Sequence, residues 1–320
     1  MTQSKWKQRA AHALPWLLLA LALWLMLSQV ERPAALVNVG IQWARVGALS
    51  IVMTGIILTG GIDLSVGSMI ALSSVTMGIL WRDGVVGVFW QDGMPAELAA
   101  GAAIITGIIA GAFNGTLVVI GLSPLVATLA TMAFYSGLAM MISAGDKITR
   151  LPEPMIDVSQ LAGCPGEYWV LGLIFIVALI VIHFTRFGRW CYAIGDNPIA
   201  ARFAAVPVSW TQWWLYTASG LVAGVLATVY TMRNGAIPNA HHGVELEAIA
   251  CVVVGGTLIT GGRGGIPQTL LGLAVISNVD IGLFFLSFKF KLIGADARLL
   301  VVGALLILVA VWNQRLARQE

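Results

Sequence analysis

Charged residues are scarce in this chain of 320 residues, where Asp, Glu, Lys and Arg together make up 10%. Soluble globular domains carry about 25% charged residues. Hydrophobic residues account for 58% of the sequence, and the mean hydropathy is +0.89. This composition excludes an ordinary soluble domain and predicts a protein that lies in a lipid bilayer. The net charge of +3 is too small to indicate a nucleic-acid partner, so none is predicted.

Disulfide and metal-ligand patterns are also missing. The three cysteines are Cys164, Cys191 and Cys251. They show no Cys-x-x-Cys spacing and have no histidine at ligand spacing, so neither a disulfide framework nor a metal site is predicted. The pair His241-His242 lies near Glu245 and Glu247. Because neighbouring histidines point apart on most backbones, a plain outer loop is favoured there over a metal site.

Motifs for catalysis and nucleotide binding are missing as well. The sequence has no G-x-x-x-x-G-K-[ST] loop, and the glycine-rich stretch 261–265 lacks the lysine and hydroxyl that hold phosphate and magnesium. Neither G-x-S-x-G nor H-E-x-x-H occurs. We therefore expect a chain that is not an enzyme and that binds no cofactor of its own.

Long apolar runs of about 15 to 23 residues fill the chain, which favours a helical bundle over a membrane barrel of alternating strands. The prediction is an all-α polytopic membrane protein with about ten transmembrane helices in one domain, residues 1–320. The expected spans are 14–30, 41–60, 64–81, 98–120, 123–143, 169–185, 212–231, 247–261, 266–286 and 297–312. Asp280 is expected to interrupt the ninth. No convincing cleavage site follows the first run, which is expected to stay as a helix.

Lysine and arginine indicate the orientation, because they are enriched on the cytoplasmic side of a membrane. An even number of spans places both termini on one side. Bases lie near both ends, at Lys5, Lys7, Arg9, Arg315 and Arg318, which puts the termini in the cytoplasm. Residues 186–211 then lie inside, whereas 82–97 and 144–168, with most of the acids, lie outside. Some bases depart from this pattern, notably Lys147, Arg150, Arg233 and Lys289.

The stretch TGGIDLSVGS, residues 59–68, places an acid inside apolar sequence. A carboxylate at the bilayer centre costs about 2.5–3.5 kcal/mol on insertion scales. Asp63 is therefore expected at an interface, at a broken helix or beside a partner. Gly60 and Gly61 before it and Ser65 after it predict a tight cytoplasm-side turn between the second and third spans, with Asp63 as a helix cap. Proton relay and substrate binding are the less favoured alternatives.

The longest polar segment predicted inside, 186–211, is expected to contain a short helix. Asn197 is a good cap and Pro198 suits a first helical position, so a turn or two should follow until Pro207. Such a helix on the cytoplasmic surface has a shape that another protein can grip. The alternative is a capped helix that only joins two spans.

A faint internal repeat links two stretches. Residues 53–61, MTGIILTGG, match residues 254–262, VGGTLITGG, with the Thr-Gly-Gly triplets aligned. Duplicated halves are common in transporters, although chance identity among small residues is the alternative.

Four stretches together resemble a known family. They are GGIDLSVGS at 60–68, TRFGRWCYAIGDNPIAARFAAVPV at 185–208, YTASGLVAG at 216–224 and GVELEAIACVVVGGTLITGGRGG at 243–265. In this order they resemble the permease subunits of bacterial ribose-type ABC sugar importers. The resemblance extends over nearly the whole chain.

The resemblance implies a BtuC-like, ribose-permease-like bundle in the bacterial cytoplasmic (inner) membrane, surrounded by lipid. It implies a second permease subunit, identical or paralogous, and an extracytoplasmic solute-binding protein. It also implies separate ABC ATPase subunits that bind ATP and magnesium. Segment 186–211 then becomes the part that couples to the ATPase.

The implied site residues fall into two groups. The coupling residues are Gly188, Gly195, Asn197, Pro198, Ala200, Ala201, Ala205 and Val206, and the signature turn comprises Gly60, Gly61, Asp63, Ser65 and Gly67. The family usually has glycine where Ala205 stands. The implied solute is a monosaccharide or a related small polar molecule, which the resemblance does not name.

Polar residues inside apolar runs are the candidates for the translocation path. They are Asn114, Thr128, Thr131 and Asn278. The main alternative function is an ion-coupled secondary transporter, which needs intramembrane acids; only Asp63, Asp280 and Asp296 qualify, and all lie near expected helix ends. A membrane enzyme would need a cluster of catalytic side chains, and the sequence shows none.

Overall fold

The computed structural model describes residues 33–84, 93–149, 160–161, 163–290 and 303–304. Its helices are α2 (Pro33–Leu58), α3 (Val66–Asp83), α4 (Ala96–Val119), α5 (Pro124–Ser143), α7 (Gly166–Leu179), the π-helix η1 (Ile180–Phe184), α8 (Arg186–Asp196), α9 (Pro198–Phe203), α10 (Val208–Asn234), α11 (Val244–Val254) and α12 (Ile266–Phe290). Two short strands, β1 (Gln160–Leu161) and β2 (Cys164–Pro165), pair antiparallel. The all-helical prediction is confirmed.

The expected spans from the second to the ninth each coincide wholly or in part with described helices, because long apolar runs form helices in a membrane. The first expected span, 14–30, and nearly all of the last, 297–312, lie outside the described residues, as do both chain ends. Five described helices are long and apolar enough to cross a bilayer: Val37–Leu58, Ala96–Val119, Pro124–Ser143, Gly166–Phe184 and Val208–Asn234.

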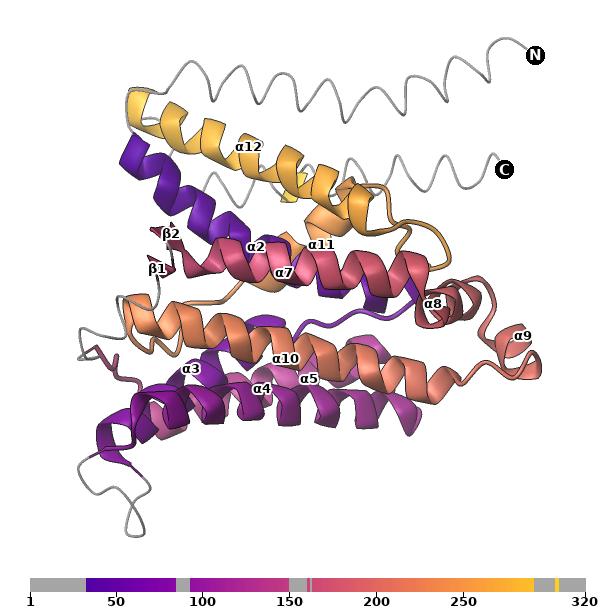
Figure 1. Cartoon of the computed structure of the whole chain (residues 1–320), viewed down its shortest axis with the longest axis horizontal. Helices are drawn as coiled ribbons and strands as arrows, with labels where there is room; N and C mark the ends of the chain where they lie inside the picture. The colour runs from indigo at the N-terminus through magenta and orange to yellow at the C-terminus, as the bar shows by residue number, and fades with distance from the viewer. Residues whose placement is uncertain (1–32, 85–92, 150–159, 162, 291–302, 305–320) are drawn as a thin grey trace.

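The long helices lie side by side, and α8 and α9 project at one end, away from β1 and β2 (Figure 1). Helix α10 makes its closest approach to α4, where Gly111 faces Gly220. A Cβ atom on Gly111 would lie 2.8 Å from the Cα of Gly220. Such small-residue contacts are typical of membrane proteins, since helices in lipid associate by close packing.

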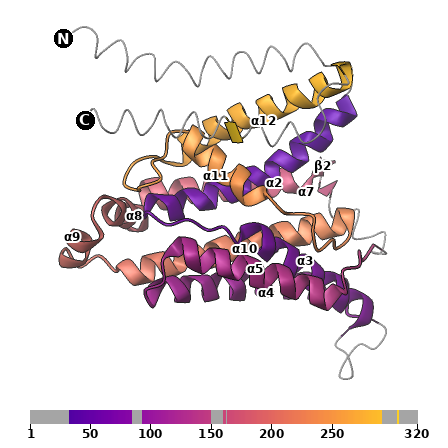
Figure 2. The ribbon, with the colours of Figure 1, turned by 180° about the vertical axis from the view of Figure 1, so that it is seen from behind.

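Helix α11 corrects one expected span. The sequence predicts a full crossing over 247–261, but α11 has 11 residues and ends at Val254. At about 1.5 Å per residue it spans roughly 17 Å, about half of a hydrocarbon core of about 30 Å. The pair Gly255-Gly256 follows, and the backbone of Gly256 has a left-handed φ of 103°. The chain reverses there, and α11 packs between α2 and α12 (Figure 2).

Asp280 does not interrupt the ninth span as expected, because α12 runs through it from Ile266 to Phe290. Its carboxylate accepts a hydrogen bond of 3.0 Å from the indole Nε1 of Trp43 on α2. A buried acid that has a hydrogen-bond donor from a neighbouring helix does not need to break its own helix.

Candidate functional site

Helix α9 forms where the sequence predicts it. Asn197 adopts an extended conformation, and its Oδ1 accepts hydrogen bonds of 3.0 Å from the amides of Ile199 and Ala200. Pro198 occupies the first turn, where its missing N–H has no cost. Two of the free amides at the start of the helix are thereby satisfied.

The end of α9 is closed by a left-handed residue. The amide of Val206 donates to the carbonyl of Ala201 at 3.0 Å, and that of Ala205 donates to Arg202 at 3.1 Å. This pair of bonds is a Schellman motif, which places its closing residue in the left-handed region. Ala205 has that conformation, with φ 58°. Glycine would adopt this backbone conformation with less strain than alanine.

Replacement of Ala205 by glycine is expected to stabilise the end of α9 by about 0.5–1 kcal/mol, because glycine relieves the left-handed Cβ clash. Hydrogen exchange of the amides in 203–208 should slow by about two- to fivefold. The matched control is Ala204→Gly, at an ordinary φ of −83°, which should instead speed exchange. Equal effects of the two substitutions would contradict the role of the left-handed backbone.

The outer face of α9 is apolar and uncovered. Ala201 packs inward against Ile194 and Val208. Ile199 and Phe203, four residues apart on the same face, are 68% and 89% exposed. Large apolar side chains that project from a short capped helix are typical anchors for a partner protein.

At Gly195, helix α8 contacts the backbone at two places where the chain turns, one after α2 and one after α11. A Cβ atom there would overlap the carbonyl oxygen of Leu58 and the amide nitrogen of Gly262. These two groups also bond to each other, with Gly262 N donating to Leu58 O at 3.0 Å. The repeated stretches 53–61 and 254–262 therefore meet beneath α8. Tyr192 adds a further link through a 2.8 Å bond from its hydroxyl to the carbonyl of Gly264.

Gly188 is required at the other end of α8. A Cβ atom on it would overlap the carbonyl group of Ile182 in η1. Both α8 glycines thus allow the helix backbone to touch its neighbours directly, so α8 is held against the end of α2, against η1 and against the loop between α11 and α12.

The signature stretch is longer than the tight turn that the sequence predicts. Thr59 and Gly60 turn the chain, and residues 61–65 then run without helix into α3. Gly60 has a left-handed φ of 76°. The carbonyl of Ile62 accepts hydrogen bonds from the hydroxyls of Thr128 and Tyr216, both at 3.3 Å. Donors from α5 and α10 satisfy the irregular backbone, which is tolerated at this depth because protein surrounds it.

Asp63 joins this stretch to α10. It is fully buried. Its Oδ1 accepts from the amide and the hydroxyl of Ser65 at 2.9 and 2.7 Å, and its Oδ2 accepts from the hydroxyl of Ser219 at 2.9 Å. The carboxylate thus binds the backbone at the start of α3, as predicted, and also a distant helix that the sequence does not indicate.

Known proteins resemble this chain over most of its length. The family model described as the branched-chain amino acid transport system / permease component matches residues 35–310. The chain belongs to this permease family. The ribose import permease protein RbsC of Bacillus subtilis is 35% identical over 294 residues, which cover 88% of this chain and 85% of that protein.

Two further relatives agree with this assignment. RbsC of Escherichia coli K12 is 34% identical over 85% of this permease and 83% of its own length. The fructose import permease protein FruG of Bifidobacterium longum is 35% identical over 72% and 70%. No solved structure matches the chain. This permease is a multi-pass protein of the bacterial inner membrane.

Three of the four path candidates gather around the signature stretch of the permease. Asn114 donates to the hydroxyl of Ser65 at 2.6 Å and accepts from the hydroxyl of Tyr135 at 3.1 Å. Thr128 bonds to Ile62, and Thr131 donates to the carbonyl of Thr128 at 3.2 Å. These bonds join helices, and a role in the translocation path stays a prediction.

Asn278 lies apart from that group, on α12. Its side chain donates to the carbonyl of Ala274 in its own helix at 2.6 Å, and it is 8% exposed. The structure therefore does not bring the fourth candidate to the other three, and its place in a path also stays a prediction.

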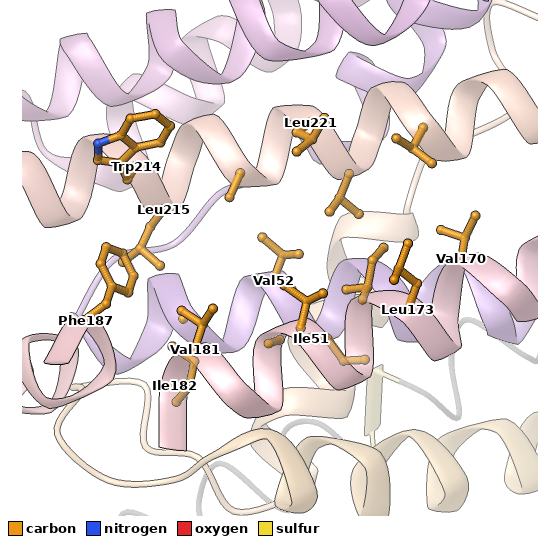
Figure 3. Close-up of a pocket in the computed structure, with 17 residues that line it drawn as sticks. Ile51, Val52, Val170, Leu173, Val181, Ile182, Phe187, Trp214, Leu215 and Leu221 are labelled. Carbon is orange, nitrogen blue, oxygen red and sulfur yellow. The ribbon is translucent and has the colours of Figure 1, made fainter. Parts of the chain in front are cut away.

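A cavity of about 340 Å³ lies between α2, α7 and α10 (Figure 3). Apolar side chains line it, among them Ile51, Val52, Leu173, Trp214 and Leu221. Hydroxyl groups would find no hydrogen-bond partners along such walls, so this cavity suits hydrocarbon and not a sugar.

His241 corrects the prediction of a plain outer loop. It is 2% exposed, and its ring packs edge-on against Tyr230 with ring centroids 4.4 Å apart, whereas His242 is exposed. The two rings point apart, as expected. In the part of the chain that the structure describes, no group of three or more His, Cys, Asp or Glu residues is placed to hold a metal.

Proposed function

We propose that this chain is the membrane subunit of an ATP-binding cassette importer and forms the translocation path for a monosaccharide or a related small polar solute. The import of ribose by two of its relatives and of fructose by a third supports a sugar as solute. The uncovered apolar face of α9 supports coupling to a separate ATPase. That face is the observation that carries the proposal.

The ATP and magnesium are bound in the partner ATPase, and this chain is not an enzyme. Closure of the ATPase moves α9, and α8 transmits the movement to the end of α2 and to the loop between α11 and α12 through Gly195, Leu58 and Gly262. Packed elements transmit such displacements as rigid bodies. A second permease subunit, identical or paralogous, completes the path, and an extracytoplasmic binding protein delivers the solute.

A transport assay tests the proposal. The permease is expressed with the ATPase and binding protein encoded beside it, and a thermal-shift screen of sugars and branched-chain amino acids finds the ligand of the binding protein. We expect a sugar to bind and its uptake to require ATP. Uptake that persists without the ATPase would favour an ion-coupled secondary transporter instead. Binding of a branched-chain amino acid would agree with the description of the family and would contradict the proposal that the solute is a sugar.

The proposed topology has about ten spans and both termini in the cytoplasm, and the native cysteines test it. Cys164 is exposed and lies in the segment proposed to face outward. A membrane-impermeant maleimide added to intact spheroplasts is expected to label it. Cys191, on the cytoplasmic side, is buried, and burial raises the pKa of its thiol to about 12. Since the thiolate is the reactive species, Cys191 should stay unlabelled.

The control for this labelling is Cys164→Ser, which should remove the signal because Cys191 and Cys251 are both buried. Strong labelling of Cys164 only after the membrane is permeabilised would reverse the proposed orientation.

A further inference from the structure

A second, polar cavity of about 170 Å³ lies in the middle of the bundle. Its lining residues are Gln42, Arg45, Val46, Ile70, Ala240, His241 and Val244. Arg45 is the thirteenth of the 26 residues of α2, so the cavity lies about halfway along a helix that crosses the bilayer. A water molecule occupies about 30 Å³ in the liquid, so a solute equal to about five or six waters fits.

Unsatisfied polar atoms line this cavity. The Nε2 atom of His241 and the Nε atom of Arg45 are buried without a hydrogen-bond partner. The guanidinium of Arg45 lies 4.7 Å from the centroid of the Tyr230 ring, which fixes its plane. Buried polar groups without partners cost free energy, and a ligand that supplies the partners removes this cost.

Two interrupted helices begin beside the cavity. Gly67 in the first turn of α3 faces the carbonyl of His241 and the carboxylate of Glu245 in the first turn of α11. Both helices start inside the bundle after non-helical segments. Interrupted helices of this kind surround the solute sites of many transporters near the bilayer midplane.

Charges of both signs surround the cavity, with the acids in excess. The carboxylates of Glu167 and Glu247 attract the guanidinium of Arg45, and the guanidinium of Arg233 repels it. Two guanidiniums therefore lie near these two carboxylates. Glu245 adds a further acid nearby. An anion therefore gains no net attraction, whereas hydroxyl groups, which both donate and accept, match the imidazole, the guanidinium and the amide of Gln42.

We propose that this cavity is a binding subsite for a neutral polyhydroxylated solute in transit, held by Arg45, His241 and Gln42. The inference rests on the proposed import function and adds the location and chemistry of the site. It places the solute contacts beside α3 and α11, on residues other than Asn114, Thr128 and Thr131.

The test uses the assembled importer in lipid nanodiscs. D-ribose, D-xylose and D-fructose at tens of millimolar are expected to raise its melting temperature, whereas D-ribonate and L-leucine are not. Gln42→Ala should weaken the sugar response about five- to tenfold by removing an amide partner. Gln42→Trp, which fills the cavity, should abolish it. Ser50→Ala removes a buried hydroxyl on the same helix without lining the cavity, and should respond as the wild type does.

The outcomes separate the subsite from the import function. A Gln42→Trp importer that binds and transports sugar with unchanged KM overturns the subsite while import stands. A wild-type importer with no response to any of the three sugars, or with a stronger response to ribonate or leucine, also overturns it. A wild-type importer that shows no ATP-dependent uptake would instead contradict the proposed import function.

Discussion

Phe203→Ala is expected to abolish stable binding of the partner ATPase and, with it, ATP-dependent solute uptake. Phe203 is 89% exposed on α9, and no part of the described chain covers it. Truncation of an aromatic anchor at a protein interface commonly costs at least 2 kcal/mol, which is roughly a thirtyfold loss of affinity. Copurification of the ATPase with the permease measures the loss directly.

The control for this prediction is Phe113→Ala on α4, where a half-exposed phenylalanine lies on a membrane-spanning helix. Copurification should stay at the wild-type level. If Phe203→Ala retained the ATPase and full uptake, α9 would be a simple connection between α8 and α10, and the coupling proposal would be wrong.

Asp63→Leu is expected to prevent assembly of the bundle. The substitution leaves three buried donors without their acceptor: the amide and hydroxyl of Ser65 and the hydroxyl of Ser219. Each such loss costs about 1–3 kcal/mol, so the three together cost at least about 3 kcal/mol, which is a large part of the stability of a protein. Melting temperature and fluorescence-detected size-exclusion profiles in detergent measure the effect.

A milder substitution at the same residue should have a smaller effect. Asp63→Asn keeps one acceptor oxygen and should cost about 1–3 kcal/mol, with unchanged choice of solute in the protein that folds. Asp83→Asn is the matched control at the other end of α3, because Asp83 is half-exposed and pairs with Arg82 at the surface. Normal expression of Asp63→Asn together with an altered solute preference would show instead that Asp63 contacts the solute.

Local patterns explain why much of the permease can be predicted from its sequence. Apolar runs of about 20 residues form helices in a membrane because their backbone groups must bond internally. The Asn197-Pro198 pair predicts the start of α9 from its own side chain and backbone, without reference to any other helix. Even the left-handed backbone at Ala205 follows from the local closure of α9.

Contacts between distant residues explain what could not be predicted. Trp43 and Asp280 are 237 residues apart in sequence, and only their packing lets α12 continue. His241 is buried because residues 235–243 fold back into the bundle beside α2. No periodic pattern of hydropathy in the sequence indicates this path. The meeting of Gly195 with Leu58 and Gly262 has one sequence signal, the repeated Thr-Gly-Gly triplets, and that signal does not show that the two repeats touch.

The sequence by itself therefore determined that this chain is a helical membrane permease with a short, capped connecting helix, because hydropathy and capping act within a few helical turns. Only the tertiary structure decided that α11 is a half-length helix, that Asp63 bonds to α10, and that Arg45 and His241 line one cavity. Those features arise when helices far apart in sequence are brought within a few ångströms. Their polar groups are then satisfied by each other or, in the cavity, by the solute that we propose.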